Sequence, residues 1–267
     1  MNIAGKVFVV TGAGNGIGRE VTLQLLRSGA SVAGVDLNAD GLAETVALAA
    51  AGNRLSTHTV NITDREAVEA LPAAVADIHG AVDGIVNVAG VIQKFVKIID
   101  LPYEEIEKVM TVNFWGTLHM VKAFLPVLVE RPDAAIVNVA SMGAYAAVPG
   151  QAVYGASKAA VGLLTEALYA ELQGTSVAVT AIYPGAIGTN IAANSGVVMD
   201  MPDGDAAASA RKTTTPAEAG RVIVEAIAKG RFRATIGKDA ATMDKLSRLN
   251  PKYATELIAK QMGDLLG

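Results

Sequence analysis

Short β-branched runs alternate with longer helical patterns along the chain, and this alternation restricts its fold more than any other feature. The runs are almost continuously apolar, as strands buried on both faces of a sheet are. Strands that alternate with helices form a parallel sheet, and right-handed crossovers place helices on both of its faces. The sequence therefore predicts an α/β fold with a doubly wound parallel sheet of about seven strands, at residues 6–10, 31–36, 55–61, 83–90, 134–141, 176–184 and 231–237.

Apolar residues at helical spacing fill the intervals between these runs. No linker, repeat or low-complexity stretch divides the chain, so we expect a single domain over residues 1–267. A barrel of strand–helix units would need eight similar units, so it is the less favoured architecture. The helices are expected at about 16–28, 39–51, 64–79, 103–130 and 153–174, with a further helix opened by Pro216.

The composition is rich in apolar residues and poor in charge. Charged residues make up 18% of the chain and apolar residues 51%, against roughly 25% charged in an average globular protein. We interpret this as large buried surfaces and as an indication of a homo-oligomer. The net charge of -4 and the absence of any Lys/Arg run argue against nucleic acid as a partner.

Two absences in the sequence exclude further classes. The chain has no cysteine, which excludes disulfides, thiolate metal sites and cysteine nucleophiles. No stretch reaches the roughly 18 uninterrupted apolar residues of a membrane-spanning helix. We therefore expect a cytoplasmic protein that acts on a small molecule, without nucleic acid or membrane as partners.

A glycine-rich turn, TGAGNGIG at residues 11–18, joins the first predicted strand to the first helix. Glycines allow the backbone to turn tightly and approach a pyrophosphate, and the helix N-terminus supplies N–H groups at the positive end of its dipole. The spacing departs from the G-x-G-x-x-G template, whose third glycine would fall on Ile17 or Arg19. Its position between a strand and a helix nevertheless predicts a dinucleotide site.

Asp36 ends the second predicted strand, where a carboxylate would meet the adenosine ribose hydroxyls of a bound dinucleotide. A 2′-phosphate needs a basic partner, yet Leu37 and Asn38 follow Asp36, and Asn15 in the turn is uncharged. The carboxylate would repel that phosphate. Arg19 lies within the helix and could in principle reach it. On balance the sequence predicts NAD(H) in preference to NADP(H).

Tyr154 and Lys158 lie four residues apart in a predicted helix and therefore project from one helix face. A free tyrosine has a pKa of about 10, which makes it a weak base near neutrality. An ammonium nearby, together with the positive charge of an oxidised nicotinamide, would lower that pKa. Tyr154 could then take a proton from an alcohol or give one to a ketone. Ser141, at the carboxyl end of the fifth predicted strand, would position the substrate oxygen.

The motifs occur in the order and spacing of one known family. They are T-G-x-x-x-G-x-G at 11–18, N-x-A-G at 87–90, Y-x-x-x-K at 154–158 and P-G at 184–185, together with Asn61, Asn113, Ser141 and Thr189. On these motifs the sequence resembles the short-chain dehydrogenase/reductase family across nearly its whole length. The resemblance implies a Rossmann fold, NAD(P)(H) as cofactor, a homotetramer or dimer, and a catalytic tetrad of Asn113, Ser141, Tyr154 and Lys158.

The resemblance also implies roles for single residues. Lys158 would hydrogen-bond the nicotinamide ribose hydroxyls, and Asn113 would hold a water that links the lysine to solvent. Val88 stands where family members more often carry a second asparagine. The expected cofactor contacts are Gly12, Asn15, Gly16, Ile17, Gly18, Asp36, Leu37, Asn61, Ile62, Asn87, Ala89, Gly90, Tyr154, Lys158, Pro184, Gly185, Ile187 and Thr189.

The family places a mobile substrate lid between the sixth strand and the helix at Pro216, here at about 190–215. Val197, Val198, Met199 and Met201 occur there among small and acidic residues. Flexible methionines suit an adaptable apolar pocket, although these side chains could equally pack the lid onto the body. We expect an apolar or aromatic ketone or secondary alcohol as substrate. Besides Ser141 and Tyr154, the expected substrate contacts are Phe95, Tyr145, Val148 and Gln151.

A C-terminal tail with helical spacing, at about 239–267, extends beyond the seventh strand. Its apolar stripe needs a partner, which could be its own body or another subunit. The acyl-carrier-protein reductases of the family stop soon after that strand, so the tail argues against such a role. His58, His79 and His119 are isolated and lie on different elements, and we expect no metal site.

Together these features predict an NAD(H)-dependent alcohol dehydrogenase or carbonyl reductase that interconverts a secondary alcohol and a ketone, with Tyr154 as general acid and base. One alternative enzyme is a 3-oxoacyl reductase for acyl carrier protein or coenzyme A thioesters, which should prefer NADPH and need a basic docking patch. An alternative from another class is a non-catalytic dinucleotide-binding protein, against which the intact Ser141–Tyr154–Lys158 set argues. A sugar-nucleotide epimerase would need a larger substrate domain than 267 residues allow.

Overall fold

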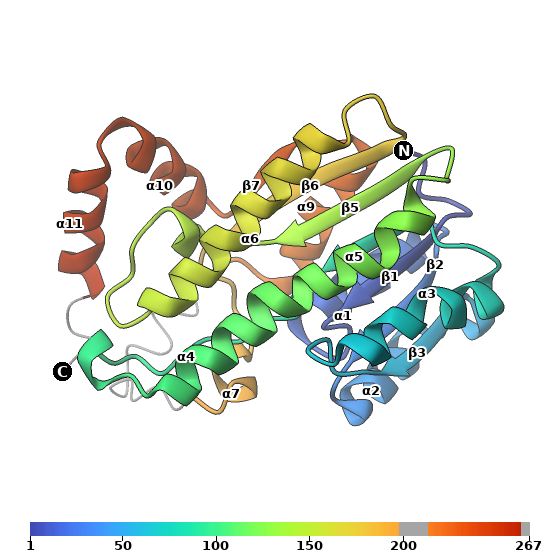
Figure 1. The fold of residues 1–267 in the computed structure, drawn as a ribbon, viewed down its shortest axis with the longest axis horizontal. Helices are drawn as coiled ribbons and strands as arrows, with labels where there is room; N and C mark the ends of the chain where they lie inside the picture. The colour runs from blue at the N-terminus through green and yellow to red at the C-terminus, as the bar shows by residue number, and fades with distance from the viewer. Residues whose placement is uncertain (198–212, 263–267) are drawn as a thin grey trace.

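The computed structural model describes residues 1–197 and 213–262, and its centre is a seven-stranded parallel sheet (Figure 1). The strands are β1 (Val7–Thr11), β2 (Ser31–Asp36), β3 (Leu55–Thr59), β4 (Gly84–Asn87), β5 (Ala134–Val139), β6 (Val177–Pro184) and β7 (Arg233–Ile236). They lie in the order β3-β2-β1-β4-β5-β6-β7. The strand order reverses between β1 and β4, so the carboxyl edge of these two strands is the topological switch point. The predicted doubly wound parallel sheet is confirmed.

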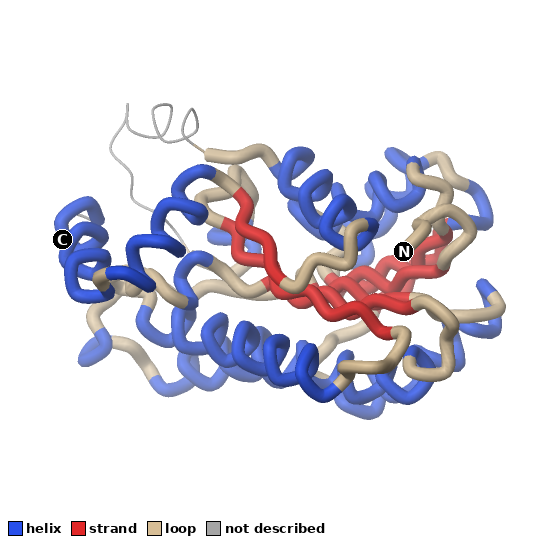
Figure 2. Tube along the Cα trace, turned by 90° about the horizontal axis from the view of Figure 1, so that it is seen from above, coloured by secondary structure: helices blue, strands red, loops and turns tan. Residues whose placement is uncertain are grey.

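Helices cover both faces of the sheet, which Figure 2 shows as a layer of strands between two layers of helices. Within the described ranges the helices are α1 (Gly16–Arg27), α2 (Ala39–Ala49), α3 (Arg65–His79), α4 (Tyr103–Met110), α5 (Thr117–Leu128), α6 (Ala152–Glu171), α7 (Ile191–Asn194), α9 (Pro216–Ala228), α10 (Lys238–Leu249) and α11 (Pro251–Met262). None of these described helices is both long enough and apolar enough to cross a membrane.

The core is divided by the sheet into two halves, because successive strand residues point to opposite faces. Phe8 of β1 packs in the half that contains Leu25 of α1 and Ile223 of α9. The next residue, Val9, packs in the other half, which contains Phe124 of α5. Burying each of these large side chains contributes roughly 1.5–3 kcal/mol. The two halves hold the strand ends, and thus the site described below, in fixed relative positions.

The single helix predicted over 103–130 is interrupted, and this prediction was wrong in that respect. The chain makes a π-helical turn at Thr111–Gly116 between α4 and α5. A Cβ on Gly116 would lie 2.6 Å from the Ile62 side chain, so the wide turn packs closely against Ile62. The turn contains Asn113, whose side chain bonds to the backbone of Val91 rather than to its own helix. The contacts that accompany this π-helical turn come from segments remote in sequence, so the local helical period does not indicate the turn.

The C-terminal tail packs on the body of its own chain. Helices α10 and α11 form the end of the molecule that lies beyond β7 in Figure 1. Met243, Ala254 and Ile258 are buried together with Ala146, which belongs to the loop after β5. The sequence left open whether the apolar stripe of the tail packs on its own body or on another subunit. These contacts are with its own body. The end of the predicted tail, with Leu265 and Leu266, lies outside the described residues, as does most of the predicted lid, including Val198, Met199 and Met201.

Candidate active site

The glycine-rich turn brings β1 and α1 into contact without intervening side chains. Gly12 has a φ of 71°, in the left-handed region, and a Cβ on Gly18 would overlap the carbonyl oxygen of Gly12. Asn15 is the N-cap of α1, and among the described residues its side chain bonds to none of the first N–H groups of the helix. These N–H groups are therefore available to a bound anion, as the sequence predicted for a pyrophosphate.

A cavity of about 620 Å³ opens at this turn, at the carboxyl edge of β1, β2 and β4. Its walls bring together most of the predicted cofactor contacts from distant parts of the chain. A dinucleotide fits this arrangement, because bare backbone and a helix N-terminus lie beside the carboxylate of Asp36. The predicted residues that line the cavity are Gly12, Asn15, Gly16, Ile17, Gly18, Asp36, Leu37, Asn61, Ile62, Ala89, Gly90 and Thr189.

Other lining residues were missed by the sequence reasoning. Most are sequence neighbours of predicted contacts, so the motif positions themselves were a signal for them. Lys108 of α4 had no such signal, because only the folded chain brings this lysine to the cavity. These additional residues are Gly14, Val35, Asn38, Val60, Thr63, Val88, Val91, Lys108, Val112, Asn190, Ile191 and Asn194.

The carboxylate of Asp36 is held by backbone N–H groups. Its Oδ2 accepts from Gly14 N at 2.9 Å and its Oδ1 accepts from Asn38 N at 2.9 Å. Arg19 also lies beside this turn, because its guanidinium donates to the carbonyl oxygen of Gly14. The same guanidinium pairs with Glu44 at 2.6 Å and donates to Thr45 Oγ1 at 3.0 Å, so its charge is already paired with a carboxylate.

Asn87, at the end of β4, lies deeper than the cavity wall. Its Nδ2 donates to Asn138 Oδ1 at 2.8 Å, and Asn138 Nδ2 donates to Thr165 Oγ1 at 3.0 Å. The Oδ1 of Asn87 is buried with no hydrogen-bond partner in the part of the chain that the structure describes. This predicted contact thus joins β4 to β5 and α6, and does not itself line the cavity.

Ser141 and Tyr154 meet through their side chains. Ser141 follows β5 and begins a short turn, where its Oγ accepts from Gly143 N at 3.0 Å. Burial raises the pKa of Tyr154, and a hydrogen bond with the Ser141 side chain lowers it to a smaller extent. The net direction is therefore upward, whereas the lowering expected from the sequence also requires the positive charge of an oxidised nicotinamide. The physical cause is the cost of placing a phenolate in a poorly solvated position.

Lys158 lies one helical turn beyond Tyr154 and is buried. Its Nζ donates to the carbonyl oxygen of Val139, the last residue of β5, at 3.0 Å. Burial lowers the pKa of Lys158 to about 8. A Cβ on Gly90, a wall residue of the cavity, would lie 3.1 Å from this Nζ. The amine is therefore next to the cavity, although it does not form part of its lining.

Asn113, on the π-helical turn, is completely buried. Its Oδ1 accepts from Val91 N at 2.8 Å, and its Nδ2 donates to Val91 O at 2.9 Å and to Ser157 Oγ at 3.0 Å. The Oδ1 would also lie 3.1 Å from a Cβ on Gly90. Asn113 and Lys158 thus flank Gly90 in the segment that follows β4.

The loop after β6 carries the predicted contacts for the nicotinamide side. Pro184 ends β6, and Gly185 and Ile187 come next in the chain. They lie behind Thr189, which lines the cavity. Asp239, in the first turn of α10, accepts from Ala186 N through Oδ2 at 2.7 Å, and a Cβ on Gly185 would overlap its carboxylate. Sequence reasoning missed Asp239, and no local pattern marks it.

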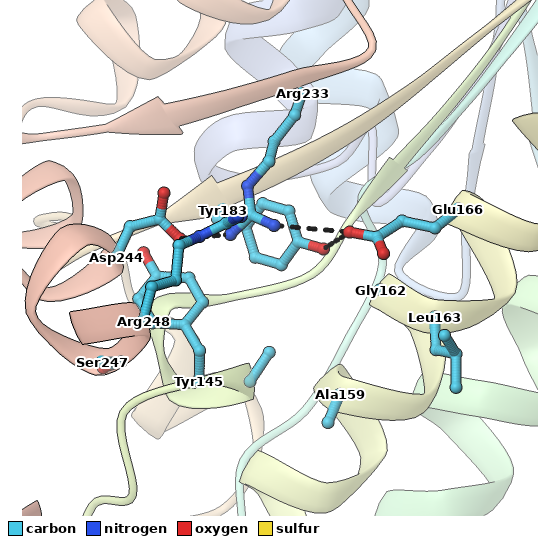
Figure 3. Close-up of a pocket in the computed structure, with 11 residues that line it drawn as sticks. Tyr145, Ala159, Gly162, Leu163, Glu166, Tyr183, Arg233, Asp244, Ser247 and Arg248 are labelled. Carbon is cyan, nitrogen blue, oxygen red and sulfur yellow. Dashed lines mark hydrogen bonds and ion pairs between the residues drawn. The ribbon is translucent and has the colours of Figure 1, made fainter. Parts of the chain in front are cut away.

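The expected substrate contacts are only partly brought together. Gln151 is buried and donates to Gln93 O at 2.8 Å. Tyr145 donates to Ala240 O at 2.9 Å and lies beside Tyr183 in a second cavity of about 300 Å³ on the other side of the loop after β5 (Figure 3). Val148 packs on the apolar cluster of the tail, and Phe95 is half-buried.

Two of the three histidines are not isolated, and the expectation that they would be was wrong. Ser56 Oγ lies 3.1 Å from His58 Nε2 and 2.9 Å from His79 Nε2. The edge strand β3 and the end of α3 bring them together, which sequence distance conceals. Among the described residues no group of three or more His, Cys, Asp or Glu side chains could hold a metal ion.

Comparison with known proteins decides the family. A family model described as short chain dehydrogenase matches residues 6–197. The chain belongs to the short-chain dehydrogenase family. Within it, the chain is 38% identical to SadH of Mycobacterium tuberculosis, a protein named as an oxidoreductase, over 96% of this chain and 94% of SadH.

Two solved structures share the fold over most of their length. One is a short chain dehydrogenase/reductase from Burkholderia phymatum in complex with NAD, at 27% identity, a TM-score of 0.85, and coverage of 95% of this chain and 96% of that one. The other is a serine dehydrogenase in complex with NADP+, at 27% identity, a TM-score of 0.77, and coverage of 86% and 93%. A nicotinamide dinucleotide is thus the cofactor type of these relatives, and both forms of it occur among them.

Proposed function

We propose that this protein is an NAD(H)-dependent oxidoreductase that interconverts a secondary alcohol and a ketone, with Tyr154 as general acid and base. The observation that carries the proposal is the proximity of the Ser141 and Tyr154 side chains, both of which would lie 3.5 Å from a Cβ on Gly143, one helical turn from the buried amine of Lys158. Family membership supplies the reaction class, and these three side chains are the groups that reaction needs.

In the oxidation direction, the substrate hydroxyl would donate its proton to Tyr154 Oη while Ser141 Oγ bonds the same oxygen. The chemistry that a bound nicotinamide supplies is transfer of a hydride to or from the substrate carbon. Hydride and proton together account for the two hydrogens that convert the alcohol to a ketone. Lys158, when charged, stabilises the phenolate form of Tyr154 and so offsets the effect of burial on its pKa. In the reduction direction, Tyr154 returns the proton to the ketone oxygen.

The preference for NAD(H) rests on the carboxylate of Asp36 and on the position of Arg19. A 2′-phosphate at the end of β2 would meet Asp36, followed by the uncharged Leu37 and Asn38. Arg19 lies near this position through its bond to Gly14 O, but its charge is paired with Glu44. Relatives bind either cofactor, so the support comes from these side chains and not from the family.

An apolar substrate class is supported by the surroundings of the loop after β5. Met142, Tyr145 and Val148 of this loop pack on the apolar cluster formed by α10 and α11. This loop begins at Ser141, so the walls nearest the reacting oxygen are apolar on the side of the tail. Burying apolar substrate surface there contributes about 25 cal/mol per Å². We therefore propose an apolar or aromatic ketone, or the corresponding secondary alcohol.

The proposal is tested by following NADH and NADPH oxidation with a panel of aliphatic, aromatic, steroid and acyl-thioester ketones. Turnover of an apolar ketone with NADH is the expected result. Tyr154→Phe should lower kcat by at least about 100-fold. Tyr169→Phe, the same change on the solvent side of the same helix, is the matched control and should leave kcat unchanged. A preference for acyl thioesters and NADPH would instead support a 3-oxoacyl reductase.

Turnover that survives Tyr154→Phe would contradict the assignment of Tyr154. If the unmodified protein binds NADH but turns over no ketone of the panel, the function as a dehydrogenase of this substrate class is contradicted, and a non-catalytic dinucleotide-binding role is favoured.

A further inference from the structure

Gln93 is a fully buried polar residue in the segment that leads away from β4, and the proposed reaction has so far given it no role. It lies three residues after Gly90, outside every motif that the sequence singled out. Its side-chain amide is directed at the N-terminus of α6, the helix that carries Tyr154 and Lys158. A buried amide requires partners for its donor and acceptor atoms, and the partners of Gln93 are specific.

The Oε1 of Gln93 accepts two backbone hydrogen bonds, from Val153 N at 2.9 Å and from Tyr154 N at 3.0 Å. These are the second and third residues of α6, the positions whose N–H groups an N-cap side chain normally satisfies. The helix's own N-cap residue, Gln151, makes no such bond. Gln93 therefore performs the capping from a segment about 60 residues away in the sequence.

The orientation of the Gln93 amide is determined on both sides. Its Nε2 donates to Gly150 O at 2.9 Å, so a flipped amide would place a donor against two N–H groups and an acceptor against a carbonyl. Its backbone carbonyl accepts from Gln151 Nε2 at 2.8 Å. Gln93 is thus bonded to four residues around the start of α6: to two through its Oε1, to one through its Nε2 and to one through its backbone carbonyl oxygen.

The bonds of Tyr154 complete a closed ring. Ser157 Oγ donates to Tyr154 O at 2.7 Å and accepts from Asn113 Nδ2 at 3.0 Å. Asn113 in turn pairs with both backbone groups of Val91, two residues before Gln93. The N–H of Tyr154 is therefore bonded directly to the segment 91–93 that borders the cofactor cavity, and its C=O is linked to the same segment through Ser157 and Asn113.

We infer that Gln93 is a positioning residue for the reaction: as the N-terminal cap of α6, it holds the backbone of Tyr154 at a set distance from the cofactor cavity. The inference rests on the proposed function, because it concerns the placement of the same acid and base. Gln93 itself touches neither substrate nor reacting atoms. Displacement of a catalytic group by about 1 Å can cost on the order of 100-fold in rate, so loss of the cap should be visible in kcat.

The first test needs no variant. In the unmodified protein, amide hydrogen exchange at Val153 and Tyr154 should be as slow as in the middle of α6, although first-turn N–H groups of helices usually exchange fast. Ile17 occupies the equivalent second position of α1, lines the cavity and lacks a capping side chain, so its amide should exchange faster. Equally fast exchange at Val153, Tyr154 and Ile17 would overturn the inference.

The second test removes the cap with little change in volume. Gln93→Met should lower kcat by about 10- to 100-fold while leaving the Kd for NADH within about 3-fold, because the glycine-rich turn is not altered. Gln24→Met is the matched control: Gln24 bonds Ala217 O between α1 and α9, far from Tyr154, and its loss should leave kcat unchanged. A purely structural role would lower the active fraction and stability but not the kcat of the folded enzyme.

Gln93→Glu supplies the rescue, because a carboxyl group keeps the acceptor for Val153 and Tyr154. Its kcat should exceed that of Gln93→Met by at least about 5-fold under the same conditions. Equal kcat for Gln93→Met, Gln24→Met and the unmodified enzyme would overturn the inference and leave the proposed function intact. No turnover in the unmodified enzyme, by contrast, would overturn the proposed function, and the positioning role with it.

Discussion

Lys158 donates a hydrogen bond from its buried Nζ to the carbonyl oxygen of Val139, 3.0 Å away, at the last residue of β5. One carbonyl replaces the hydration that an ammonium has in water, and burial accordingly lowers the pKa of Lys158 to about 8. The fold therefore keeps an ionisable group in a position that favours its neutral form, at a cost in stability.

Lys158→Met should therefore stabilise the cofactor-free fold at pH 7 and abolish turnover. Between pH 8 and the ordinary lysine value near 10.5 the unfolded chain binds more protons than the folded one, so stability rises with pH through that window. The penalty is fully present at pH 7 and absent above the ordinary value, and its removal is worth about 1–3 kcal/mol. Urea unfolding at pH 7 and at pH 10 checks this, and a gain that is larger at pH 10 would contradict it.

Gly18→Ala should weaken cofactor binding, because a Cβ at this position overlaps the carbonyl oxygen of Gly12 and forces the turn apart. We expect NADH affinity to fall by at least about 10-fold, with destabilisation on the order of 1–3 kcal/mol from overpacking. Gly52→Ala is the control: its Cβ meets no neighbour within 4 Å, so it introduces only the strain of a φ of 58°. NADH titration by fluorescence should show a lower affinity in Gly18→Ala than in Gly52→Ala. Unchanged affinity in Gly18→Ala would contradict the prediction.

Asp36→Asn combined with Leu37→Arg should shift the cofactor preference toward NADPH. Asparagine keeps a side-chain oxygen for the backbone N–H of Gly14 or Asn38, while the repulsion of a 2′-phosphate disappears and a cation is added. The ratio of kcat/KM for NADPH over NADH should rise by about 10-fold or more, equivalent to about 1.4 kcal/mol. Leu48→Arg, at an exposed position of α2, adds the same charge away from the carboxylate. If that control shifts the preference equally, the reading of Asp36 is wrong.

Asp239→Ala should weaken the binding of cofactor more than it changes stability. Asp239 accepts the hydrogen bond of Ala186 N at 2.7 Å and so holds the loop between Pro184 and Thr189 against α10. Its loss should raise the KM for NADH about 3- to 10-fold, because the loop must be ordered at the moment of binding. Asp77→Ala, at an exposed position of α3, is the control. A change in thermal stability with an unaltered KM would contradict this role.

The protein should lose stability in mild acid through His58 and His79. Burial lowers the pKa of His58, with a smaller contribution from His79, and burial lowers the pKa of His79. Below the ordinary value of 6.5 the unfolded chain binds more protons, so stability present at neutral pH is lost as the pH falls. Thermal unfolding at pH 7.5 and 5.5 should show a smaller difference for His58→Gln than for the unmodified protein. If the two proteins lose equal stability between pH 7.5 and 5.5, the His58–His79 pair is excluded as the source of that loss.

Several features of the fold and site were predictable because they depend on short stretches of chain. The strand and helix periods predicted the seven strands, and the motifs predicted half of the residues that line the cavity. The capping of α3 by Asp64 and of α9 by Thr215 beside Pro216 is likewise local chemistry. These elements and caps can be predicted from the sequence because backbone sterics and side-chain alternation act over a few residues.

What only the tertiary structure decided involves residues far apart in the chain. The raised pKa of Tyr154 follows from burial of its side chain, which no local sequence pattern indicates. The cap that Gln93 places on α6 and the bond from Ala186 to Asp239 join segments more than 50 residues apart. By itself, the sequence determined that a Tyr–Lys pair would stand at the end of a doubly wound sheet. The packed fold decided how that pair is held and charged, because desolvation and buried hydrogen bonds exist only once remote segments exclude water together.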